Sequence, residues 1–157
     1  MRANNTTLEG EDRSYKELYK QTDLILDHIP ALIFYKDLNN RYIRVNKYVA
    51  DAHNMSKQEL RGKSIFDLYP REEAQAYWDD DLEIANSGKP KQNIIEPWHT
   101  EEGKKWVSTS KIPVKDEEGN VTAILGISID ITEQKESELR YQKLADSTQK
   151  LLEKLPI

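Results

Sequence analysis

Few side chains in this sequence could carry catalysis or hold a metal. The chain contains no cysteine, which excludes disulfides, thiolate zinc sites, thioether-linked haem and a cysteine nucleophile. The three histidines, His28, His53 and His99, have no metal-ligand spacing among them, and each is interpreted as a surface or capping residue. The sequence has no Gly-rich phosphate loop and no local Ser/His/Asp arrangement. It therefore predicts a protein without a catalytic site and without a metal site.

Charge and hydropathy exclude further classes. The 157 residues include 23 Lys and Arg against 28 Asp and Glu, which gives a net charge of −5. Without a run of five basic residues there is no electrostatic footprint for nucleic acid or for an anionic membrane surface. The longest apolar runs, 31–35 and 123–127, fall far short of the roughly 18 residues of a membrane span, and the N-terminus lacks the apolar core of a secretory signal. We expect one soluble, cytoplasmic domain with extensions, whose parent protein could be membrane-attached elsewhere.

The two ends of the chain share one helical pattern. After a polar stretch, 1–12, which we expect to be a loose tail, residues 13–29 predict an amphipathic helix that Pro30 ends. Its apolar residues recur at spacings of 3, 4, 3 and 4, the a/d rhythm of a coiled coil, and the same rhythm returns 126 residues later before Pro156. The matched residues are Tyr15, Leu18, Thr22, Ile25 and Ile29 in the first copy and Tyr141, Leu144, Thr148, Leu151 and Leu155 in the second. This internal repeat predicts that the second copy leads into a next unit of a tandem array; the alternative is a chance match of two short helices.

Between the repeats, the pattern predicts strands first, then helices, then strands again. Residues 32–36 and 42–45 form a hairpin around a turn at 37–40. Short helices follow at 46–53 and after the capping-box sequence 56–59, and a longer helix runs from Pro70 to Ser87-Gly88. Segments 91–98, 105–115 and 121–131 read as three further strands. This order predicts an α+β domain with one antiparallel sheet.

Several segments in this order resemble a PAS domain, the sensory box of multi-domain signalling proteins. They are Phe34-Tyr35-Lys36-Asp37, Val45-Asn46, Gly62-Lys63-Ser64, Trp106 with Thr109 to Val114, and Gly126 to Glu133, which includes the specific closing Asp130-Ile131-Thr132. The resemblance covers about residues 25–135. It implies a PAS core at 30–132 with a five-stranded sheet in the order 2-1-5-4-3, short helices on one face, and a signalling helix at 133–157.

The resemblance also implies a function. PAS domains are non-catalytic sensory or regulatory modules that bind a small molecule or partner, dimerise through flanking helices and bias an output domain in the same chain. A histidine kinase of a two-component pathway is the expected output; the alternatives are a cyclic-dinucleotide enzyme, or a purely structural dimerisation and spacer domain without ligand. The missing cysteine excludes a flavin photo-adduct, and the long helix 71–87 has no histidine for haem. The cofactor, if one exists, stays unknown.

By the same resemblance, one face of the sheet lines a ligand pocket, and two lysines point into it. Because strand residues alternate between faces, the expected pocket residues are Phe34, Lys36, Glu96, Val107, Thr109, Lys111, Ile124 and Ser128, with Gly126 on the same face. Buried ammonium groups must be paired or lose their protons. Either an internal acid pairs with them, for which Glu96 is the nearest candidate, or a small anionic ligand with a carboxylate or phosphate does.

Two further sites concern signal transmission and assembly. Asp130, Ile131 and Thr132 form the expected relay, because a carboxylate and a hydroxyl there can cap the exit helix. The expected seam of a homodimer comprises Tyr15, Leu18, Ile25, Tyr141, Leu144 and Leu151. The alternative is that the first helix folds onto its own sheet. Trp98 and Trp106 on adjacent strands could mark a stacking site, but are more simply a cross-strand pair.

Overall fold

The computed structural model describes the backbone of residues 4–156 and the side chains of residues 10–156. Its centre is one five-stranded antiparallel sheet in the order β2-β1-β5-β4-β3, which confirms the predicted fold class and strand order. The strands are β1 (Leu32–Asp37), β2 (Tyr42–Val45), β3 (Lys91–Thr100), β4 (Gly103–Lys115) and β5 (Val121–Asp130).

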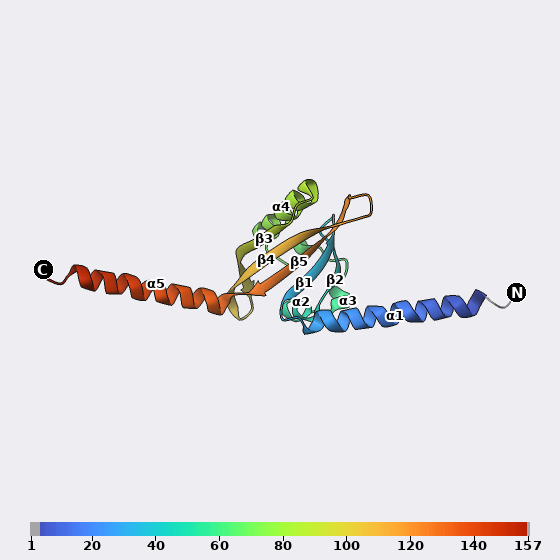
Figure 1. Ribbon diagram of the computed structural model, residues 1–157, viewed down its shortest axis with the longest axis horizontal. Coiled ribbons are helices and arrows are strands. Elements are labelled where there is room, and N and C mark those ends of the chain that lie inside the picture. The colour runs from blue at the N-terminus through green and yellow to red at the C-terminus, as the bar shows by residue number, and fades with distance from the viewer. Residues whose placement is uncertain (1–3, 157) are drawn as a thin grey trace.

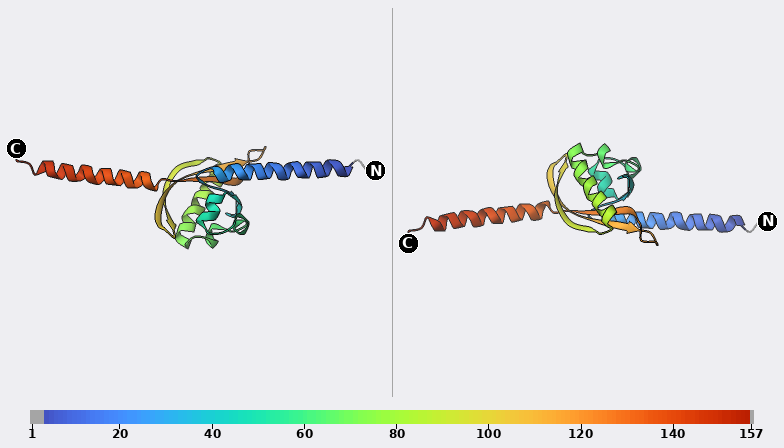
Figure 2. Two further views of the ribbon diagram at one scale, coloured as in Figure 1. Left: turned by 90° about the horizontal axis from the view of Figure 1, so that it is seen from below. Right: turned by 90° about the horizontal axis from the view of Figure 1, so that it is seen from above.

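The shorter helices lie together on one face of this sheet (Figure 2). They are α2 (Lys47–Ala52), α3 (Lys57–Leu60), the 3-10 turn η1 (Ile65–Asp67) and α4 (Arg71–Ser87). Ser56 and Glu59 form the predicted capping box before α3, and Gly88 ends α4 in the left-handed conformation, with φ 63°. The sequence reading did not anticipate η1, although Ser64 and Asp67 cap each other there in the same reciprocal way.

The two flanking helices, α1 (Asn4–His28) and α5 (Thr132–Glu153), project away from opposite ends of the domain (Figure 1). Helix α1 begins at Asn4 and so includes residues 4–12, which the sequence predicted as a loose tail; residues 1–3 and 157 lie outside the described residues. Residues 4–29 contain no proline, so no missing backbone N–H interrupts the helical hydrogen bonds between the predicted tail and the predicted helix. Helix α5 ends at Glu153, before the last repeat residue, Leu155.

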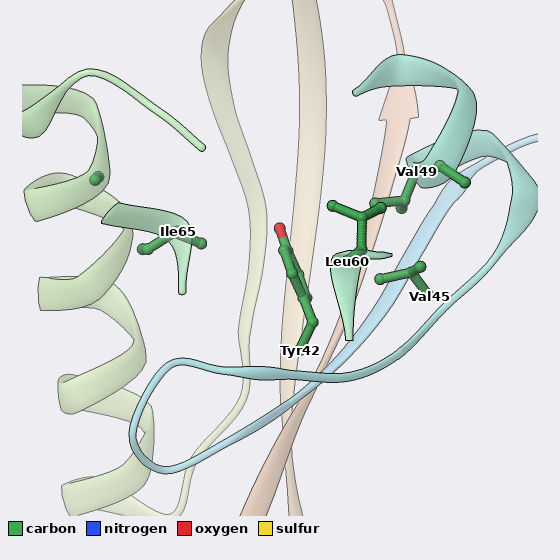
Figure 3. Close-up of a cluster of buried hydrophobic side chains, with 7 residues drawn as sticks. Tyr42, Val45, Val49, Leu60 and Ile65 are labelled. Carbon is green, nitrogen blue, oxygen red and sulfur yellow. The ribbon is translucent and has the colours of Figure 1, made fainter. Parts of the chain in front are cut away.

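The apolar core lies between the helices and the β1–β2 end of the sheet. It is built from Tyr42, Val45, Val49, Ala50, Leu60, Ile65 and Ala74. In Figure 3, Tyr42 stands between Ile65 on one side and Leu60 on the other. At Gly126 on β5 the ring of Phe34 lies directly on the backbone, and a Cβ there would overlap it. Only glycine therefore accommodates the Phe34 ring at this position.

Candidate ligand-binding site

A small cavity of about 50 Å³ lies between the helical layer and the inner face of the sheet. Its wall includes seven of the expected pocket residues: Phe34, Lys36, Glu96, Val107, Thr109, Lys111 and Ser128. Ile124 is buried but does not line it. Since drug-sized ligands occupy roughly 300–1,000 Å³, this cavity in its present form accommodates a molecule of a few heavy atoms or a few waters.

The two lysines in this cavity share one carboxylate from α4. Asp81 accepts a hydrogen bond from Lys36 through Oδ2 and one from Lys111 through Oδ1, the latter at 2.8 Å. All three side chains are 2% exposed. Lys111 also donates to the carbonyl oxygen of Tyr77 at 3.1 Å. The internal acid that pairs with the lysines is therefore Asp81, and not Glu96 as the sequence reading expected.

The spacing on α4 explains this difference. Asp81 follows Ala74 by seven residues and Tyr77 by four, so it lies on the same helix face as both. The buried residues of the helix are Ala74, Asp81 and Ile84, whereas the apolar side chain of Leu82, the next residue after Asp81, is 37% exposed. An acid at a helical core position was a signal that the sequence reading missed.

Glu96 belongs to a separate hydrogen-bond chain on the strands. The Thr109 hydroxyl donates to Glu96 Oε1 at 3.0 Å and lies 2.8 Å from the Ser128 hydroxyl. Burial raises the pKa of Glu96, and this effect is opposed by the Thr109 hydrogen bond and by the charge of Lys111. Burial likewise lowers the pKa of Lys36, opposed by Asp81. With both acids ionised, two ammonium groups face two carboxylates, and the cavity wall is neutral.

Three tyrosines and a histidine complete the polar wall, and sequence reasoning did not assign any of them to it. The Tyr69 hydroxyl lies 3.1 Å from His53 Nε2, and Tyr77 donates to Glu73 Oε1 at 2.6 Å. Tyr42, at the core, has a pKa raised by burial. His53 was expected to cap the short helix and does so at the end of α2, but its ring also lines the cavity, and burial lowers its pKa.

The expected relay residues join the sheet to α5. The Trp106 N–H on β4 donates to the Thr132 hydroxyl at 2.9 Å, and the Ile131 N–H donates to the Trp106 carbonyl at 2.8 Å. Asp130 accepts the Thr132 N–H at 2.9 Å and so satisfies the first free donor of α5. Ile131 occupies the N-cap position itself without a side-chain cap. Asp130 thus accepts from the first turn of α5 from the position before the N-cap, and the Thr132 hydroxyl donates to Asp130 Oδ1 at 2.6 Å while it accepts from β4.

The six seam residues are all exposed, at 59% or more. Helix α1 contacts its own domain through its polar side, where Lys57 bridges Asp23 and Asp27 at 2.7 and 2.5 Å. Arg44 also pairs with Asp23, at 3.2 Å, and its guanidinium lies 4.1 Å from the centre of the Tyr19 ring. The seam residues of α1, Tyr15, Leu18 and Ile25, are therefore exposed, whereas Leu26 lines a hollow with Ile33 and Val45 of the sheet.

The two tryptophans do not form a cross-strand pair. Trp98 faces Lys105 across the β3–β4 ladder, whereas Trp106 faces Pro97. Because partners share a face and neighbours alternate, the two rings lie on opposite faces. Trp98 lines the cavity, and Lys104 lies over the Trp106 ring at 4.5 Å.

Within the part of the chain that the structure describes, no group of three or more acidic or histidine side chains could hold a metal ion. In the same residues, no helix is long and apolar enough to cross a membrane.

Comparisons with known proteins agree with this geometry. The chain is 28% identical over 137 residues to the methanogenesis regulatory histidine kinase FilI of Methanothrix harundinacea; the match covers 87% of this chain but only 15% of the kinase. The PAS domain of Bordetella pertussis BvgS has a TM-score of 0.60 at 23% identity, over 83% of this chain and 98% of that domain. VqmA of Vibrio cholerae bound to DPO has a TM-score of 0.63 at 16% identity, over 71% of this chain and 57% of VqmA. The family model of the PAS fold matches residues 26–136, and the chain belongs to the PAS family.

Proposed function

We propose that this domain is a non-catalytic sensor that binds a small molecule in its cavity and transmits the change through α5 to an output domain of the same chain. The observation that carries the proposal is the shared use of β4 and β5. Val107 and Ser128 line the cavity. Trp106, next to Val107 on β4, and Asp130, which pairs with Val107 across the β4–β5 ladder, hold the start of α5. A shift of these strands around a ligand therefore acts directly on the first turn of the helix.

The charge balance of the cavity bears on the ligand. A small anion is the alternative ligand, and its binding requires that it displace Asp81 from the lysines or that Glu96 take up a proton. Since Asp81 already pairs with both lysines, a small neutral molecule that bonds to the hydroxyls needs no such rearrangement. The structural relative VqmA binds DPO, which supports a ligand-binding role for a domain of this fold.

The relative FilI supports a histidine kinase in a two-component pathway as the output. The present chain spans 15% of that kinase, so the output domain is itself a proposal, and a cyclic-dinucleotide enzyme is the alternative. We place the domain in the cytoplasm, without a nucleic-acid partner and without a membrane contact of its own.

We also propose a homodimer in which the flanking helices pair along the exposed seam. The polar attachment of α1 supports it, because the helix contacts its own domain through Asp23 and Asp27 and leaves its apolar a/d residues available to a second copy.

Native mass spectrometry of the purified chain, compared with its denatured mass, tests ligand binding. We expect extra mass on the native protein that is lost in Thr109→Val, which removes a cavity hydroxyl without changing side-chain volume. Thr122→Val is the matched control, since Thr122 is exposed on β5 and bonds only to the Val114 carbonyl. Extra mass that survives in Thr109→Val would place the ligand elsewhere. A native mass equal to the denatured mass, also after incubation with cell extract, would favour the structural spacer instead.

A further inference from the structure

The cavity shares two wall residues with a hollow on the surface. A groove of about 620 Å³ lies between the first turns of α4 and strand β3. Tyr77 and Glu96 line both the groove and the cavity, so these two side chains form the partition between them. The remaining groove residues are Pro70, Glu72, Glu73, Ala76, Pro97 and His99.

One hydrogen bond fixes the Tyr77 phenol in this partition. It runs from the Tyr77 hydroxyl to Glu73 Oε1, one turn earlier on α4, at 2.6 Å. The other carboxylate oxygen of Glu73 lies 3.6 Å from His99 Nδ1 on β3. If the phenol leaves Glu73, rotation about its side-chain bonds carries the ring out of the partition.

The contact between α4 and β3 can also open more easily than the contacts of α4 with η1, β4 and β5. Strand β3 is an edge strand, and α4 packs mainly against η1, β4 and β5. The α4–β3 bridges are polar: Lys91 reaches Asp80 at 2.5 Å and Glu83 at 2.9 Å, beside the Glu73–His99 contact. Exposed ion pairs of this kind hold elements together only weakly.

We propose that the boundary between α4 and β3 is the entrance to the cavity, that Tyr77 is its gate, and that it admits small uncharged molecules. The charge preference follows from the path. Anions would pass Glu72, Glu73 and Glu96, and any ion would reach a cavity whose two lysines are already balanced by Asp81 and Glu96. The proposal extends the proposed sensory function, but the route exists whether or not a natural ligand is found.

The absence of cysteine makes entry directly measurable. Ser128→Cys places a single thiol on the cavity wall, where the native side chain is 5% exposed. Methyl methanethiosulfonate is the probe, since it is neutral and leaves a methylthio group of two heavy atoms. Its rate of reaction is compared in Ser128→Cys alone and combined with Tyr77→Phe, which keeps the ring but removes the bond to Glu73. Tyr69→Phe is the matched control, because it keeps the ring that packs edge-on against Tyr77 and removes a hydroxyl that contacts His53 and not Glu73.

We expect Tyr77→Phe to raise the modification rate about tenfold, which corresponds to about 1.4 kcal/mol and lies near the range of a hydrogen bond to a charged group. Tyr69→Phe should change the rate by less than twofold. Equal acceleration by both variants, faster labelling in Tyr69→Phe, or no labelling of any folded variant would each overturn the gate. Urea unfolding of every variant confirms that the compared proteins are folded.

Substituted ethyl methanethiosulfonates test the charge preference. The hydroxyethyl and aminoethyl groups are equal in size, so their comparison isolates charge, whereas the sulfonatoethyl group is bulkier. We expect hydroxyethyl methanethiosulfonate to react at least tenfold faster than its sulfonatoethyl and aminoethyl counterparts. A faster sulfonatoethyl reaction would overturn the uncharged class and favour an anionic ligand, and a faster aminoethyl reaction would favour a cation. Because no natural ligand takes part, failure of this proposal and failure of ligand binding in native mass spectrometry are separate results.

Discussion

Replacing Asp81 by asparagine tests the buried ion cluster directly. The substitution preserves size, but the amide can accept from only one lysine and turns its NH₂ group toward the other. Lys36 and Lys111 would remain almost completely buried, at 2% exposure, with Glu96 and the Tyr77 carbonyl as their nearest remaining compensation. The folded state therefore retains a charge it cannot pair.

The expected loss in the free energy of unfolding is large for a domain of this size. Removing one partner of a buried ion pair costs about 3–5 kcal/mol, against a total stability of about 5–15 kcal/mol for a typical domain. Asp80→Asn on the same helix is the matched control. Asp80 pairs with Lys91 at the surface, where Lys91 is 38% exposed, and such pairs contribute about 0–1 kcal/mol.

Urea unfolding followed by tryptophan fluorescence measures both variants. We expect a lower midpoint for Asp81→Asn with an unchanged slope. The deficit should also shrink as pH rises toward the ordinary lysine pKa. Burial lowers the pKa of Lys36 in the folded native chain, and loss of Asp81, which opposes this shift, lowers it further. The unfolded variant therefore binds more protons than the folded variant over a wider pH range, and its stability rises with pH relative to the native chain. A loss within 1 kcal/mol of that of Asp80→Asn, independent of pH, would refute the reasoning.

Three further predictions use the same unfolding assay or a spectroscopic one. Gly126→Ala should lower the free energy of unfolding by about 1–3 kcal/mol, because the new Cβ overlaps the Phe34 ring. A second substitution, Phe34→Leu, should restore part of this stability, and no rescue would contradict the overlap. Glu96→Gln should gain stability relative to the native chain as pH rises above 4.5, the ordinary glutamate pKa, because the raised pKa of Glu96 favours folding at low pH and this contribution is lost as pH rises through the folded pKa; a difference that stays constant with pH would contradict it. Thr132→Val should leave the cavity intact but lower the order of α5 near the sheet, measured by hydrogen exchange of the helix amides, whereas Thr148→Val, in the distal half of α5, should not change exchange near the sheet.

The fold was predictable because most elements carried a local signal, with η1 as an exception. Short runs rich in aromatic and β-branched residues indicated the hairpin strands, the Ser56–Glu59 capping box indicated α3, and Gly88 indicated the end of α4. These signals are short in range, and the tertiary structure did not override them. The start of α1 was less predictable, because a helix that extends away from its domain has no packing pattern in its sequence to mark where it begins.

The candidate site was less predictable than the fold. Strand alternation placed Lys36, Thr109, Lys111 and Ser128 on one face, and all four line the cavity. The acid that pairs with the lysines could not be chosen by strand alternation alone, since it comes from α4 across the cavity. The contributions of Tyr69 and Tyr77 depend on where helices settle on the sheet, which is decided by long-range packing and not by local spacing.

The two flanking helices are attached to the domain in different ways, and this difference gives the proposed signal a direction. Helix α1 is held along its side by Lys57 and Arg44 through two carboxylates, and the Asn46 amide donates to the Leu26 carbonyl. Helix α5 has no buried residue, and the hydrogen bonds that link it to the sheet meet at its first turn, around Thr132. A small displacement of β4 and β5 can therefore reorient α5 without breaking a packed interface, whereas α1 would have to lose several ion pairs to follow. Motion that begins at the cavity should consequently appear at the C-terminal helix first.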